Sequence, residues 1–195
     1  MKRPFFIPFG LILSLTACGF IHSRQNSPSK KNFYKGQYPL SSEAVMTYPP
    51  FIHQKSPLLC GLAAARMVAA YYGRNLNPED LKAVKIAAQK MGGASGQEIK
   101  NLFQNSGFKV SVFPGSMRAG RRNVLSEIAR GRPLIVLLKK GAESHYMVMD
   151  GYDPKKNLII LNDPRHGPIA LSIKSFKMGW ESAGRFALLA FPKDP

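Results

Sequence analysis

The chain has 195 residues, 45% of them hydrophobic, and a formal net charge of +17. This length fits one domain with appendages, and the apolar content is sufficient for a buried core. The basic excess is typical of nucleic-acid-binding proteins, but Lys and Arg are spread over many segments without zinc-ligand spacing, an RNA-binding aromatic motif or a continuous basic helix. We therefore expect no nucleic acid, metal or other cofactor. Acidic polypeptides, anionic envelope surfaces or solubility alone would explain the charge.

Residues 1–17 have the pattern of a secretory signal, with a basic head at Lys2 and Arg3, an apolar middle and small residues before Cys18. Residues 15–18 (LTAC) resemble the bacterial lipobox, whose Cys is acylated and becomes the first residue of the mature chain. A plain signal peptide or an uncleaved anchor is the alternative. The polar, basic residues after Cys18 indicate a flexible tether. We expect a lipoprotein signal peptide at 1–17, a lipidated tether at 18–39 and one folded domain at 40–195.

The domain is organised around Cys60, which lies between a Pro-containing turn and an Ala-rich run that ends at Gly73. Ala favours helix and Gly commonly follows a helix end, so the sequence predicts a helix over residues 61–72 with Cys60 at or beside its N-terminus. Unpaired N–H groups and the helix dipole favour a thiolate there. The Gln54 amide, six residues upstream, is placed to donate to an oxyanion. The alternative is an inert, buried Cys60; lipidation of Cys18 would leave it without a disulfide partner in the chain.

Capping residues, apolar periodicity and Gly or Pro stops predict the other elements. The sequence predicts helices over 78–91, 96–106 and 124–130, strands over 108–113, 134–138, 145–152, 158–161, 168–173 and 185–191, and one helical turn at 175–180. Short turns between the later strands imply an antiparallel meander. Helices first and strands after imply an α+β fold with a helical lobe and a sheet lobe.

A thiol nucleophile needs a base, and the base needs a group that orients it. His145 opens one strand and Asp163 ends the next, and antiparallel strands joined by a turn bring such positions together. Pro164 biases Asp163 toward an extended conformation. A turn role for Asp163 and a partly exposed strand-end position for His145 are the alternatives. His53 is a weaker candidate for the cleft wall, and His166 is a weaker candidate for the base.

Five segments together resemble the bacteriocin-processing, or double-glycine, cysteine peptidases, which have a papain-like fold. They are Gln54 with Cys60-Gly61, residues 71–73 (YYG), 131–136 (GRPLIV), 144–153 (SHYMVMDGYD) and 162–164 (NDP). The resemblance implies that the helical N-terminal lobe carries Cys60 as nucleophile and Gln54 as oxyanion donor. It implies that the antiparallel sheet lobe carries His145 as base and Asp163 as its orienting group.

Many members of that family are N-terminal domains of ABC exporters and cleave leaders after Gly-Gly. This sequence contains no transporter helices or Walker motif, so the closer parallel is with stand-alone exported relatives linked to processing or assembly of secreted polypeptides. We expect a peptidase in the cell envelope, facing the periplasm from the outer membrane in a Gram-negative host because Gly19 follows Cys18. Its expected partners are the membrane, a secretion or assembly system, and a polypeptide substrate whose acidic leader is attracted by Arg118, Arg121 and Arg122.

Two other functions fit the same residues. One is a catalytically silent papain-like module that binds peptides, and the other is a thiol acyl or peptidyl transferase. Gly92-Gly93 most simply stops a helix, although these residues also offer a site for cleavage of the chain by itself, and Gly-Gly is one candidate cleavage sequence in a substrate.

The lipobox predicts that Cys18→Ser abolishes acylation and membrane retention, because the acyl chains on that one residue supply the anchor. Membrane fractionation and mass spectrometry of the N-terminal peptide measure this. A Cys18→Ser protein that still fractionates with membranes, beside a wild type without lipid, would contradict the assignment.

Overall fold

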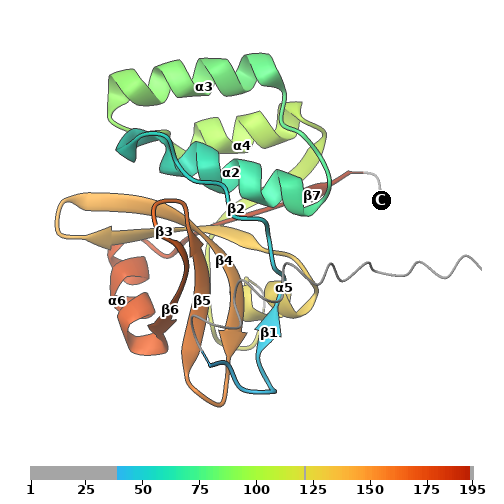
Figure 1. Cartoon of the computed structure of the whole chain (residues 1–195), viewed down its shortest axis with the longest axis vertical. Coiled ribbons are helices and arrows are strands. Elements are labelled where there is room, and N and C mark those ends of the chain that lie inside the picture. Colours follow the sequence, from blue (N-terminus) through green and yellow to red (C-terminus); the bar gives the residue numbers. More distant parts are fainter. Residues whose placement is uncertain (1–38, 121, 194–195) are drawn as a thin grey trace, which may run out of the picture.

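The computed structural model describes residues 39–120 and 122–193 (Figure 1), so Cys18, the predicted signal peptide, most of the predicted tether and Arg121 lie outside the described residues. The elements in chain order are β1 (Val45–Met46), the 3-10 turn η1 (Pro57–Leu59), α2 (Cys60–Tyr71), α3 (Pro78–Met91), α4 (Gly96–Asn105), β2 (Phe108–Pro114), α5 (Val124–Ala129), β3 (Leu134–Lys140), β4 (Glu143–Asp153), β5 (Leu158–Asp163), β6 (Gly167–Ser172), α6 (Ile173–Ser182) and β7 (Phe186–Pro192). No helix among the described residues is both long and apolar enough to cross a membrane.

The strands form one antiparallel sheet in the order β2-β7-β3-β4-β5-β6, and the short β1 pairs with β4. The predicted meander is the run from β3 to β6, in which each strand pairs with the next along the chain. The last strand, β7, lies on the other side of β3, and β2 lies outside β7. The last strand of the chain, β7, therefore pairs with β2, the strand that follows helices α2 to α4.

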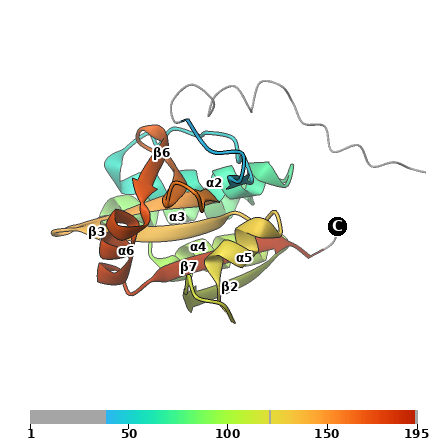
Figure 2. The ribbon, with the colours of Figure 1, turned by 90° about the horizontal axis from the view of Figure 1, so that it is seen from below.

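Helices cover both faces of the sheet (Figures 1 and 2). On one face, α2 packs against β4 and β3, and α4 packs against β2 and β7, with α3 outside them. On the other face, α5 and α6 cover a second core that contains Phe176 and Trp180. The predicted single turn at residues 175–180 was too short. Ser172 caps α6, and the spacing of Phe176 and Trp180 buries one side of a full ten-residue helix.

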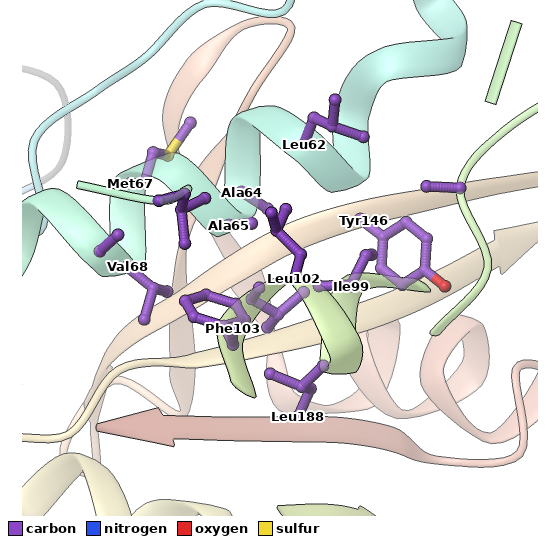
Figure 3. Close-up of a cluster of buried hydrophobic side chains, with 14 of the residues drawn as sticks. Leu62, Ala64, Ala65, Met67, Val68, Ile99, Leu102, Phe103, Tyr146 and Leu188 are labelled. Carbon is purple, nitrogen blue, oxygen red and sulfur yellow. The ribbon is translucent and has the colours of Figure 1, made fainter. Parts of the chain in front are cut away.

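The contact between α2 and β4 determines where Cys60 lies. Figure 3 shows the small side chains Ala64 and Ala65 of α2 above Tyr146 of β4 and Ile99 of α4. A Cβ atom on Gly61 would lie 2.8 Å from Cδ1 of Ile99 and 3.1 Å from Cδ2 of Tyr146. Small residues therefore let the first turn of α2 approach the sheet closely, and this approach brings Cys60 to the start of β4.

Candidate active site

Cys60 is the first residue of α2 and comes directly after the 3-10 turn η1. The Ser56 hydroxyl caps η1 by accepting from the Leu58 N–H, and Pro57 occupies its first position, where a missing N–H costs nothing. The thiol is buried, with 6% of the residue exposed. The structure thus places Cys60 at the N-terminus of a twelve-residue helix, the position that the sequence predicts.

Gln54 is buried beside this turn and makes hydrogen bonds through both its backbone and its side chain. Its backbone N–H donates to the carbonyl of Pro164 at 2.8 Å, and its Nε2 donates to the carbonyl of Ser56 at 2.9 Å. One hydrogen of Nε2 is used by Ser56, and the second is left for another acceptor. Gln54 therefore connects the segment that leads to Cys60 with the turn after Asp163.

His145 and Asp163 meet as the strand register requires. In the pairing of β4 with β5, Val148 lies opposite Asn162, so the start of β4 lies beside the end of β5. Nε2 of His145 is 2.6 Å from Oδ1 of Asp163, and both residues are buried. Since an ionised carboxylate only accepts, Nε2 carries the proton of this bond. Nδ1 is buried and has no nitrogen or oxygen partner among the residues that the structure describes, which leaves it to act on the thiol.

Burial and charge oppose each other at these three groups. Burial alone would raise the pKa of the Cys60 thiol, but attraction to the His145 ring and the backbone N–H of Tyr146 outweighs it, so the pKa is lowered. Burial would likewise lower the pKa of His145, but Asp163 and Cys60 raise it to about 9. The pKa of Asp163 falls to about 2 because, despite burial, it accepts from His145, Arg165 and His166. These shifts favour a thiolate beside an imidazolium near neutral pH.

Asp163 also has the turn role that its position before Pro164 suggested. Its Oδ1 accepts from the N–H of Arg165 at 2.8 Å, two residues along the chain, as Asp side chains do in turns. Its Oδ2 accepts from Nδ1 of His166 at 2.9 Å. The hydrogen bond from the Arg165 N–H fixes the carboxylate in position for His145. His166 contacts Oδ2, whereas His145 contacts Oδ1. His53, the other weak candidate, is exposed and stacks edge-on against Phe51.

Two cavities lie beside the catalytic candidates. The first, of about 690 Å³, has Cys60 and Tyr146 in its wall, together with Glu98. The second, of about 640 Å³, has His145 and Asp163 in its wall. We call them the Cys60 cavity and the His145 cavity. Both have the size of ordinary ligand sites.

The helix stop predicted at Gly92-Gly93 lies next to the site. Gly92 ends α3 in the left-handed conformation, with φ of 81°, and the N–H of Gly93 donates to the carbonyl of Ala88 at 2.8 Å. Both glycines also line the Cys60 cavity. The pair is thus a C-terminal cap of α3 and part of the cavity wall.

Sequence reasoning missed the contribution of Tyr146. Its backbone N–H helps to lower the pKa of the Cys60 thiol, and its buried ring lies under α2 (Figure 3). Burial, the nearby Cys60 charge and Glu98 raise the pKa of Tyr146 to about 12, so the phenol remains neutral. The sequence contained this signal, because Tyr146 directly follows His145. If the strand places His145 beside Cys60, the backbone N–H of the next residue must also lie near Cys60.

Three solved structures share this fold. The peptidase domain of Streptococcus ComA, a bifunctional ABC transporter in a quorum-sensing pathway, has a TM-score of 0.58 and 22% identity, and the match covers 73% of this chain and 97% of that one. A double-glycine-motif protease from an AMS/PCAT transporter, in complex with the leader peptide, has a TM-score of 0.56 and 19% identity over 76% and 94% of the two chains. A C39-like peptidase from Bacillus anthracis has a TM-score of 0.55 and 15% identity over 78% and 100%.

The sequence also matches a family model. The match to the peptidase C39 family covers residues 49–194, whereas no curated protein matches the chain significantly. The predicted α+β, papain-like fold is confirmed by the sheet and helices described above together with these neighbours. Because the family match spans well over half of the chain, the protein belongs to the peptidase C39 family and is a cysteine peptidase domain.

Proposed function

We propose that this protein is an exported, lipid-anchored peptidase that processes leader-bearing or secreted polypeptides. Cys60 is the nucleophile, His145 the general base and acid, Asp163 the group that orients it, and Gln54 the oxyanion donor. The observation that carries the proposal is the 2.6 Å bond between His145 and Asp163, which directs the other ring nitrogen to a thiol at a helix N-terminus.

The reaction begins when the Cys60 thiolate attacks the scissile carbonyl carbon. A C–S bond forms, and the π electrons of the carbonyl move to its oxygen. When this oxyanion collapses, the C–N bond breaks and the leaving amine takes the proton of the His145 imidazolium. Water then attacks the thioester while His145 removes one of its protons. The carboxylic acid product leaves, and the thiolate returns.

Two features support Gln54 as the oxyanion donor. The second hydrogen of its Nε2 is left by the bond to Ser56, and the side chain is fixed by burial and by its backbone bond to Pro164. The unpaired N–H groups at the start of α2 add positive potential at the same end of the helix. Donors that are fixed in advance lower the barrier most, because they need no reorganisation during the reaction.

A leader-type substrate is the best candidate. One structural neighbour is a double-glycine-motif protease in complex with the leader peptide, and on that basis we take Gly-Gly as the first cleavage sequence to test. The net charge of +17 and the exposed Arg118 and Arg122 favour acidic leader or substrate segments, which they would attract to the domain.

The proposed location is the cell envelope, with lipid on Cys18 holding the domain at the outer membrane, on the periplasmic side, in a Gram-negative host. A peptidase anchored there would meet polypeptides as they are exported, and we propose that it works with a secretion or assembly system. A transferase acting through the same thioester would join the acyl half to an amine, so the mass of the product distinguishes it from a hydrolase.

We expect iodoacetamide to alkylate Cys60 well below pH 8. The lowered thiol pKa keeps the thiolate present until the pH falls through that value, and His145 supplies the compensating charge. His145→Ala should suppress the reaction at low pH, whereas His53→Ala, which removes an exposed histidine, should not. Mass spectrometry of the Cys60 peptide across a pH series measures the rate. A Cys60 that reacts like free cysteine in both variants would contradict the proposed pair.

Loss of the oxyanion donor should separate turnover from thiol reactivity. Gln54→Ala should lower turnover of a Gly-Gly leader peptide by about 10²–10³-fold while Cys60 alkylation stays nearly unchanged. Cys60→Ala should abolish turnover, and Asp163→Asn should be milder than His145→Ala because Asp163 orients the base and carries no transferred proton. Chromatography of the products measures turnover. Full turnover in Gln54→Ala would remove that residue from the mechanism.

A further inference from the structure

The hairpin of β3 and β4 separates the two cavities. Side chains alternate between the faces of a strand, and the paired residues Leu137 and Tyr146 line the Cys60 cavity. The next pair, Leu138 and His145, lines the His145 cavity. The two cavities have no lining residue in common. The nucleophile thus belongs to one cavity and the base to the other.

The chemistry of peptide cleavage assigns a half of the substrate to each side. The acyl half becomes bonded to Cys60, so its side chains extend along the Cys60 cavity. The amine half must present its nitrogen to His145 to be protonated. The residues after the scissile bond therefore leave from the His145 side, where the second cavity begins.

The His145 cavity has an apolar wall that the protein itself leaves partly uncovered. Its apolar residues come from the hairpin, β6 and α6, and all are half-buried or exposed: Leu138, Met147, Ile169, Leu171 and Met178. Met178 is 61% exposed. An apolar surface of this kind beside a base favours an apolar side chain in the bound substrate.

The rim of this cavity is basic. Lys139, Lys140 and Arg165 contribute positive charge, and Glu143 is paired with Arg165 at 2.7 Å. Neither lysine forms an ion pair with any residue in the part of the chain that the structure describes. Asp163 is the second carboxylate of the cavity, and it is paired with His145. Two carboxylates against three cations and the His145 imidazolium leave a positive excess that attracts acidic side chains.

Packing holds the wall in place. Trp180 of α6 donates from its indole N–H to the carbonyl of Phe186 at 2.8 Å. A Cβ on Gly179 would lie 3.5 Å from Cβ of Leu138, so α6 is already in contact with β3. This wall of the cavity is therefore preformed, and the protein loses little conformational entropy there when a peptide enters.

We propose that the His145 cavity binds the residues after the scissile bond and selects an apolar side chain directly after that bond, with acidic residues beyond it. The inference rests on the proposed peptidase function, because the direction of departure comes from the protonation by His145. It extends that function by giving the site specificity for the first residues of the mature product as well as for the leader.

The first test uses the full chain and pairs of synthetic peptides that share one acyl half and carry Leu or Ala directly after the cleaved bond. Wild type should cleave the Leu peptide more efficiently, and Met178→Glu should lower this preference in kcat/KM by about tenfold, which corresponds to about 1.4 kcal/mol. Wild type should also prefer peptides with Asp over peptides with Lys at the later positions after the cleaved bond. A Lys139→Glu/Lys140→Glu variant should reverse this preference. Ile86→Glu changes another exposed apolar residue, on α3, and should leave both preferences unchanged.

The second test needs no cleavage. A fluorescent peptide that begins with Leu-Met-Asp-Glu, the type of product that the cavity would release, is titrated into full-length Cys60→Ala protein and followed by anisotropy. Binding should weaken about tenfold when Met178→Glu is added and remain the same with Ile86→Glu. Equal binding in these variants, or cleavage without a preference after the bond, would overturn the cavity proposal. Site-dependent binding without any Cys60-dependent cleavage would overturn the proposed function instead and leave the cavity as a peptide site.

Discussion

The hydrogen bond between Nε2 of His145 and Oδ1 of Asp163 is the interaction on which the site depends. It fixes the tautomer and the direction of the ring, so that Nδ1 is left for the thiol. The carboxylate is itself held by the N–H of Arg165, and the carbonyl of the intervening Pro164 accepts from the N–H of Gln54. One turn after β5 therefore positions both the orienting group for the base and the proposed oxyanion donor.

The second constraint is the close approach of α2 to the sheet. The N-terminus of α2 must lie close to β4 if Cys60 is to reach His145, and small residues on α2 permit this close approach. A Cβ atom on Gly61 would clash with Ile99 and crowd Tyr146, and the Ala side chains after Gly61 are buried. The helix N-terminus and His145 then both favour the thiolate that burial would otherwise oppose.

Much of this arrangement was predictable because it is encoded locally. The Ala-rich run after Cys60 specified α2, and the strand ends at His145 and Asp163 specified their meeting, as the register confirms. The position of β7 between β2 and β3 was not predictable, since it depends on pairing between distant segments. The two-residue β1 has too little sequence for a signal. The full length of α6 and the His145 cavity depend on packing of Trp180 against the sheet, and the lipid anchor at Cys18 stays a prediction.

If Cys60 and His145 form a charged pair, NMR titration of ¹⁵N-labelled histidine detects the charge on the His145 ring. We expect His145 to keep its imidazolium signal well above the ordinary pKa of histidine, with a transition at about pH 9. In Cys60→Ala the transition should move to lower pH, because the thiolate no longer stabilises the ring charge. A His145 that titrates at the ordinary pKa of histidine and is unaffected by loss of the thiol would rule out the charged pair.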